Sequence, residues 1–147
     1  MSIFTIAFDK PTNLTTVSKY TVFNGFIYFG LGIALIVWPG AIQTLFRERA
    51  FIGDEQGLFR ALGMAVAIIG YYLVVGGRAG SRQTAAASVI DRLTIVPLVL
   101  LPLAIAGVFP RFLITIVITD FCLAMSTWVL VRAERKPPAF GPAGRAA

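Results

Sequence analysis

Long apolar runs with at most one charged residue each alternate with short polar segments along the chain. Four of these runs are long enough, at about 17 to 25 residues, to cross a hydrocarbon layer about 30 Å thick. They cover residues 20–38, 58–76, 93–109 and 112–131. The runs lack the alternation of apolar and polar residues that is typical of strands in a membrane barrel. The pattern therefore predicts an all-α fold, a polytopic membrane protein built as a four-helix bundle.

Three details refine this predicted bundle. Pro97 and Pro102 lie inside the third run, where they remove backbone donors and are expected to kink the helix. The third and fourth runs are joined by the tight junction at residues 109–111, so they are predicted to form an antiparallel hairpin. Residues 41–52 mix apolar with charged side chains, a pattern that indicates an interfacial helix lying across the outer mouth of the bundle.

The distribution of lysine and arginine predicts the orientation of the bundle. Nine of them lie before the first run, between the second and third runs, or after the fourth, and four lie on the opposite side. Positive residues concentrate on the cytoplasmic side of a membrane, so both termini are predicted to be cytoplasmic. In a bacterium this would be the plasma or inner membrane.

The same reading divides the chain into three parts. Residues 1–19 are predicted to be an N-terminal cytoplasmic segment and residues 20–132 the transmembrane domain. Residues 133–147 are rich in Pro, Gly and Ala and carry positive charge, so we expect them to form a disordered cationic tail.

The amino-acid composition excludes several kinds of catalytic and metal-binding site. The 147 residues are 57% hydrophobic and 14% charged, against about 25% charged in an ordinary soluble domain. No histidine is present and Cys122 is the single cysteine. A histidine-based triad, a histidine-bound metal or haem, a disulfide within the chain and an iron–sulfur cluster are therefore excluded. We expect no metal site and no cofactor. The net charge of +6 is assigned to helix ends and not to nucleic-acid binding.

Asp120 is the most informative residue. It lies about nine residues into the fourth run, or roughly 13 Å from its outer boundary, where an acid costs about 2.5–3.5 kcal/mol on insertion scales. A helical projection places Asp120 in a wide polar arc that is expected to face the bundle. The other members of this arc are Thr115, Thr119, Cys122, Ser126 and Thr127. The cost of burying the acid has to be offset by a partner on another helix.

The second run offers a candidate partner. Arg60 heads a stripe of small residues at helical spacing, Gly63, Ala67 and Gly70, which would let another helix approach closely. Arg60 is therefore predicted to point inward and to reach Asp120, directly or through a water molecule.

Three further polar residues complete a predicted ligand-binding pocket near mid-membrane. Asn24 and Tyr28 lie one helical turn apart on the first run, and Tyr71 shares the Arg60 face of the second. A structural interpretation competes with this one. Asp120 and Arg60 would then only pin two helices in register, and Asn24 and Tyr28 would only join helices by hydrogen bonds.

Glu55 also has two interpretations. With Gly53 and Asp54 it forms a sequence typical of a turn followed by an acidic helix N-terminus. The functional alternative makes Glu55 a second catalytic carboxylate at the mouth of the bundle.

The segment of residues 58–63, Leu-Phe-Arg-Ala-Leu-Gly, the single mid-membrane acid in the last helix and the four-helix topology resemble the DoxX-like group of small membrane proteins. The resemblance covers roughly residues 20–132. It implies either an accessory component or a link to quinone or thiol oxidation, although one cysteine and no histidine speak against thiol chemistry within this chain. A looser similarity is to small membrane-embedded terpene cyclases, in which Asp120 would be the acid and Glu55 a second one.

Three functions follow from these residues. The first is a pocket for a lipophilic small molecule, with Asp120 as proton donor for isomerisation or cyclisation. The second is a non-catalytic accessory subunit that packs against a larger membrane protein complex, with its cationic tail near lipid headgroups. The third is a small proton-coupled transporter. Expected partners are membrane lipids, a lipophilic molecule and either a larger complex or further copies of the chain. Whether the protein is an enzyme stays open.

Overall fold

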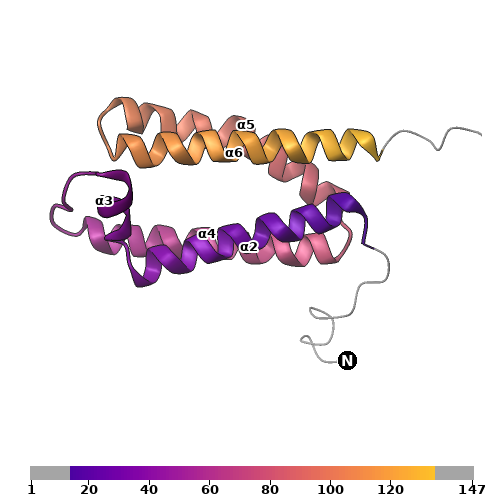
Figure 1. Ribbon diagram of the computed structural model, residues 1–147, viewed down its shortest axis with the longest axis horizontal. Helices are drawn as coiled ribbons and strands as arrows, with labels where there is room; N and C mark the ends of the chain where they lie inside the picture. The colour runs from indigo at the N-terminus through magenta and orange to yellow at the C-terminus, as the bar shows by residue number, and fades with distance from the viewer. Residues whose placement is uncertain (1–13, 135–147) are drawn as a thin grey trace, which may run out of the picture.

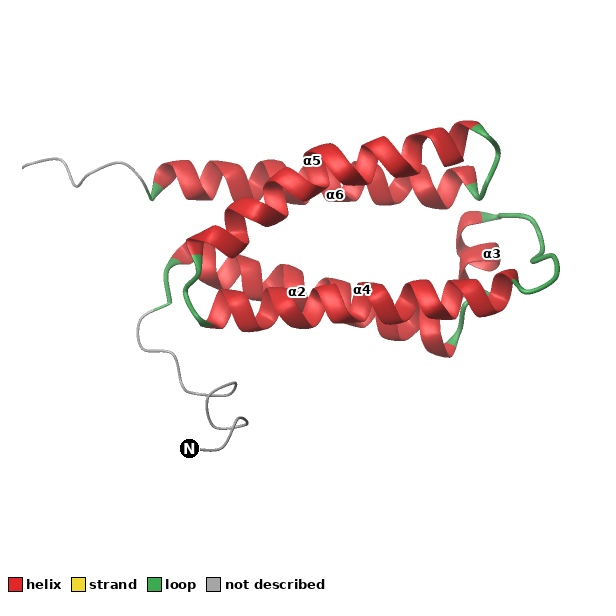
Figure 2. Ribbon diagram, turned by 180° about the vertical axis from the view of Figure 1, so that it is seen from behind, coloured by secondary structure: helices red, strands yellow, loops and turns green. Residues whose placement is uncertain are grey.

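A computed structural model describes residues 14–134, which contain five helices and no strand (Figure 2). These are α2 (Thr16–Val37), α3 (Ala41–Phe46), α4 (Glu55–Arg78), α5 (Arg82–Ile105) and α6 (Pro110–Ala133). All but α3 are long and apolar enough to cross a membrane. The 24 residues of α4, α5 or α6 extend over about 36 Å at 1.5 Å per residue. The predicted all-helical fold with four long apolar helices is confirmed.

Helix α5 begins at Arg82, well before the predicted span at 93–109. The hydroxyl of Ser81 accepts a hydrogen bond from the Thr84 N–H at 3.1 Å and caps the helix. The alanines at 85–87 then continue it, because alanine has the highest helix propensity. Arg92, which marked the edge of a loop in the sequence, therefore lies in the middle of a helix.

The predicted interfacial helix over 41–52 is wrong beyond Phe46. Arg47 adopts a left-handed backbone conformation with φ of 51° and ends α3 after six residues. The following loop turns again at Gly53, where φ is 56°. The shorter α3 lies at one end of the bundle, where Ile42 and Phe46 pack into the apolar core.

The long helices form two pairs. Helices α2 and α4 pack against each other along their length, and α5 and α6 form the second pair, the predicted antiparallel hairpin (Figure 1). A short turn after Arg78 leads from α4 into α5, which runs obliquely from the first pair toward α6 (Figure 2). The two pairs touch each other far less than the helices within each pair do.

Small residues bring α2 and α4 into backbone contact. A Cβ atom added to Gly32 would lie 2.4 Å from the backbone nitrogen of Ala67, and one added to Gly70 would lie 2.3 Å from that of Phe29. No side chain fits in either place. The predicted role of Gly63, Ala67 and Gly70 in close helix packing is confirmed, since all three are buried against α2.

At the α3 end, aromatic side chains join the two pairs. Phe59 of α4 packs edge-on against Phe109 with ring centroids 4.8 Å apart, and Phe46 of α3 packs against Phe112 at 5.3 Å. The loop after α3 adds a polar contact, because Glu48 accepts the N–H of Phe112 at 2.9 Å. That N–H belongs to the first turn of α6, where backbone donors lack partners within the helix.

At the opposite end, the first and last described helices meet. The N–H of Val17 donates to the Glu134 carboxylate at 2.8 Å, and Arg82 lies 3.9 Å from the same carboxylate. The start of α2 and the end of α6 therefore lie at one end of the bundle (Figure 1). Helix α6 continues through Ala133, the first residue of the predicted tail. The rest of that tail beyond Glu134, and the N-terminal segment before residue 14, lie outside the described residues.

Candidate functional site

A cavity of about 670 Å³ lies between the two helix pairs. This volume is within the range of about 300–1,000 Å³ that is typical of small-molecule pockets. Its walls come from α2, α3, α4, α5 and α6, and most of the side chains that line it are apolar. A mostly apolar cavity with a few polar groups is the usual form of a site for a lipophilic molecule.

The polar groups are unevenly placed along this cavity. Toward α3 the lining is mostly apolar and includes Leu35, Phe46, Leu62, Leu100 and Phe112. Toward the turn between α4 and α5 it includes polar side chains from the first half of α5. These are Thr84, Ser88, Asp91 and Arg92. The cavity is therefore amphipathic along its length.

Three polar side chains from three helices meet where these two halves join. The hydroxyl of Tyr28 in α2 donates a hydrogen bond to the Asp120 carboxylate in α6. The guanidinium carbon of Arg92 in α5 lies 4.7 Å from the centroid of the Tyr28 ring. Arg92 and Asp120 each follow ten residues after the start of their helices, about 15 Å along the axis. The cluster Tyr28–Arg92–Asp120 thus lies near the middle of the bundle.

This cluster places a positive and a negative side chain on either side of one aromatic residue. Asp120 is 5% exposed and Arg92 is 4% exposed. The hydrogen bond satisfies one carboxylate oxygen, and the electron-rich face of Tyr28 attracts the guanidinium, an interaction of about 0.5–2 kcal/mol. Asp120 and Arg92 do not form a direct ion pair among the described residues.

The structure brings only some of the predicted pocket residues together. Tyr28 meets Asp120, as expected. Asn24 is buried one turn away but does not line the cavity, and its side-chain oxygen has no partner among the described residues. Tyr71 is 44% exposed and lies outside the lining, whereas its neighbour Tyr72 contributes to it.

The predicted inward position of Arg60 is wrong. Its side chain is exposed and does not line the cavity. A Cβ atom on Gly63 would meet the backbone of Ile36, and α2 ends at Val37. Arg60 lies about one turn beyond this contact, where α2 no longer covers α4. Arg92 of α5, and not Arg60, is the arginine that lines the cavity together with Asp120.

The predicted polar arc of α6 faces the bundle only in part. Asp120 and Thr127 are buried, while Thr115 and Thr119 line the cavity. Cys122 and Ser126 are exposed and do not line this cavity, so only part of the arc faces the bundle.

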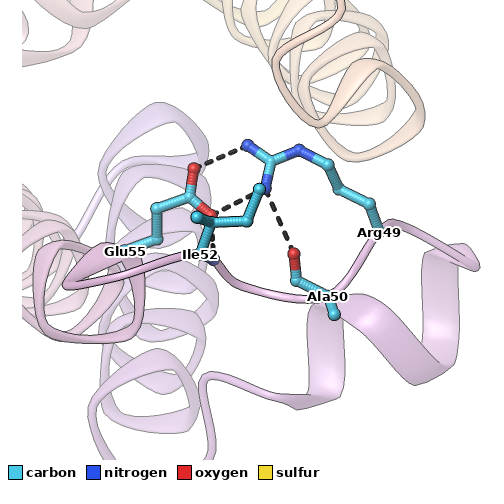
Figure 3. A network of polar contacts seen from close by, with 4 residues as sticks. All are labelled: Arg49, Ala50, Ile52 and Glu55. Atoms are coloured by element: carbon cyan, nitrogen blue, oxygen red, sulfur yellow. Dashed lines mark hydrogen bonds and ion pairs between the residues drawn. The ribbon is translucent and has the colours of Figure 1, made fainter.

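Glu55 is the first residue of α4 and does not line the cavity. Figure 3 shows its contacts with Arg49 and Ile52. Its carboxylate accepts two hydrogen bonds from the Arg49 guanidinium, at 2.6 and 2.8 Å, and one from the Ile52 N–H at 2.8 Å. The hydrogen bonding to the Glu55 carboxylate raises the pKa of the Arg49 guanidinium above its ordinary value. The interpretation of Glu55 as part of a turn and helix start describes this geometry.

Arg49 also contacts the hairpin of the second helix pair. Its guanidinium carbon lies 4.5 Å from the ring centroid of Phe109, which precedes α6. Beside it, Arg111 donates a hydrogen bond to the Arg47 carbonyl at 2.8 Å. The charged loop that was predicted to lie in the membrane interface therefore joins the two helix pairs.

Arg92 is the site residue that the sequence reasoning missed. It was counted among the positive residues of a loop because the apolar run begins at Leu93. The signal that could have found it is the capping residue Ser81 followed by the alanines at 85–87, which extend the helix by about three turns before Leu93.

Comparisons with protein families, with curated proteins and with solved structures each find no match for this chain. The resemblance to the DoxX-like group stays a prediction. The functional argument therefore rests on the geometry of the cavity and of the three polar residues that meet in it.

Proposed function

We propose that this chain is a multi-pass membrane protein that binds a lipophilic small molecule between its two helix pairs and transfers a proton to it through Asp120. The observation that carries the proposal is the cavity of about 670 Å³, whose apolar walls meet a partly buried tyrosine–aspartate hydrogen bond. Such a cavity takes an apolar molecule out of lipid and sets it beside one ionisable group.

The proposal includes an orientation. The start of α2 and the end of α6 lie at one end of the bundle, which also carries Lys19, Arg78 and Arg82. The excess of positive residues on this side supports a cytoplasmic location for both termini, in the plasma or inner membrane of a bacterium.

The chemistry proposed for Asp120 is acid–base catalysis. Its protonated carboxyl group donates a proton to one carbon of a double bond, so that a C–H bond forms as the O–H bond breaks. The carboxylate then removes a proton from a neighbouring carbon, and the double bond is displaced without net gain or loss of protons. Tyr28 donates a hydrogen bond to the carboxylate, and the positive charge of Arg92 lies on the face of the same ring. The hydrogen bond from Tyr28 stabilises the charged intermediate state of Asp120.

The test compares Asp120→Asn with Thr127→Val. Thr127 is also buried on α6, but it does not line the cavity, and within residues 14–134 its hydroxyl bonds only to the Leu123 carbonyl of its own helix. Lipophilic molecules that co-purify with each variant are measured by mass spectrometry, together with thermal stability in detergent. We expect Asp120→Asn to change the bound molecules, while its stability stays within about 0.5 kcal/mol of the native protein. Thr127→Val should retain them.

A structural role gives a different result. If Asp120→Asn is strongly destabilising, and adding Arg92→Gln restores much of the loss, the two charges serve only to hold the helices together. The proposal of a ligand site would then be abandoned.

A further inference from the structure

Arg92 is a buried cation whose hydrogen-bonding capacity is unused. Its side chain lines the cavity, yet neither Nη1 nor Nη2 has a hydrogen-bond partner among the described residues. The residue is only 4% exposed. Leaving buried donors of a charged group without acceptors is expensive, and side chains in this situation are commonly completed by something that binds to them.

The acids near Arg92 do not fill this role. Asp120 is engaged by the Tyr28 hydroxyl, and Asp91, which also lines the cavity, is the preceding residue on the same helix. Neither lies within ion-pair distance of Arg92 in residues 14–134. The face of Tyr28 attracts the positive charge but accepts no hydrogen bond from the two Nη atoms. The two Nη atoms of Arg92 therefore lack oxygen acceptors that carry negative charge.

Resting on the proposed function, we infer that the cavity takes a single-chain amphiphile with an anionic oxygen head group, a carboxylate or a phosphate, bound by Arg92. A guanidinium presents parallel N–H groups that match two oxygens of either head group, and charge-assisted bonds of this kind are the strong ones. Ser88 lies one helical turn before Arg92 and lines the same cavity, so its hydroxyl adds a further donor.

The lining also sets the direction of the chain. The head group lies at Arg92, where polar lining residues extend toward the α4–α5 turn. The apolar chain then extends the other way, past Leu100 toward Phe46 and Phe112. Leu100 is eight residues beyond Arg92, about 12 Å along α5, and α3 closes this end with its aromatic contacts. An amphiphile in the opposite orientation would place its charge against phenylalanine and leucine.

The experiment measures binding of three probes of equal chain length to the intact detergent-purified protein by native mass spectrometry. Hexadecanoate and hexadecyl phosphate carry the two candidate head groups, and hexadecanol carries none with charge. We expect at least one anionic probe to bind about tenfold or more tightly than hexadecanol. Comparison of the two anionic probes identifies which head group is preferred.

Variants connect this preference to Arg92. Arg92→Gln should remove the preference, so that the anionic probe binds no more tightly than hexadecanol, whereas Arg92→Lys should retain most of the preference. Arg132→Gln is the matched control, because Arg132 lies over the exposed ring of Trp128 at 4.0 Å, outside the cavity. It should behave like the native protein.

Two negative results have separate meanings. If the native protein binds hexadecanol as tightly as both anionic probes, the head-group inference is overturned while the lipophilic pocket stands. This comparison needs no variant, so it holds even if Arg92→Gln does not fold. If none of the three probes binds, and Val66→Trp, which fills the cavity, changes nothing, both the inference and the proposed function fail.

Discussion

The contact between α2 and α4 and the contact between the two helix pairs are built in opposite ways. In the first, glycines on both helices bring the backbones together, so that no Cβ fits at Gly32 or Gly70. In the second, side chains meet mainly at the two ends, and about 670 Å³ of space is left between them. Lipid tails are as apolar as leucine, so close packing is what holds helices together in a membrane.

The difference in packing gives the two helix pairs different roles. The α2–α4 pair provides a rigid support that holds Tyr28 in place, since α2 is fixed against α4 along its whole length. The second pair contributes Arg92 and Asp120, which contact Tyr28 near the middle of the bundle, while its helices otherwise meet this support mainly at the two ends. A site for a lipophilic molecule needs both a firm wall and a space.

Gly32→Ala is expected to weaken the contact between α2 and α4 and to have the largest effect on stability. The added Cβ would lie 2.4 Å from backbone nitrogen of Ala67 and 2.6 Å from the Gly63 carbonyl oxygen, so the helices have to separate. We expect a loss of about 1–3 kcal/mol or more in the free energy of unfolding, measured by denaturant titration in mixed micelles. Gly30→Ala is the control on the same helix, where a Cβ meets nothing within 4 Å and stability should be unchanged or slightly higher. Equal effects would contradict the role given to Gly32.

Tyr28→Phe tests the contact between the α2–α4 pair and Asp120 of α6. The ring stays beneath Arg92, but Asp120 loses the hydroxyl that donates to it. We expect a loss of about 1–2 kcal/mol in the same titration, because hydrogen bonds between helices in membranes are worth about 0.6–1.7 kcal/mol and a buried carboxylate is left without its donor. Tyr72→Phe, at a cavity residue whose hydroxyl makes no hydrogen bond among the described residues, should have no effect. A similar loss in both variants would show that the hydroxyl of Tyr28 is not special.

Glu48→Ala loosens the second contact at the α3 end. Glu48 accepts the N–H of Phe112 in the first turn of α6, so its loss leaves a helix N-terminus without its cap. We expect a decrease of about 0.5–2 kcal/mol in unfolding free energy. Asp54→Ala is the matched control, since Asp54 precedes α4 but makes no capping hydrogen bond with its side chain. Should Asp54→Ala prove the more damaging change, the proposed joint between the pairs would be wrong.

Val66→Trp tests the space between the two helix pairs, and we expect it to change stability least. Val66 lines the cavity, so a larger side chain is accommodated in existing space, and unfolding free energy should stay within about 0.5 kcal/mol. Bound lipophilic molecules, measured by mass spectrometry, should be lost. Ala65→Trp on the neighbouring exposed position should retain them, because Ala65 does not line the cavity. Retention in both variants would place the bound molecule elsewhere.

Much of the fold could be predicted, and part of the site. Apolar runs of membrane-spanning length have to satisfy their backbone groups internally, so helices were the expected solution. The spacing of Gly63, Ala67 and Gly70 correctly located a close helix contact, and Tyr28 was correctly placed near Asp120. The sequence left two interpretations of Glu55 open and did not predict its partner. In the structure a nearby loop residue, Arg49, binds the Glu55 carboxylate.

The sequence by itself determined the helical class, the need of Asp120 for a partner and the absence of histidine chemistry, because these follow from composition, helix length and the cost of a charge in lipid. Only the tertiary structure decided which arginine lines the cavity together with Asp120. Arg60 is in helical register with the packed stripe of α4, yet α2 ends before covering it. Arg92 reaches the cavity through the oblique course of α5 and the hairpin with α6, which depend on contacts between residues far apart in the chain.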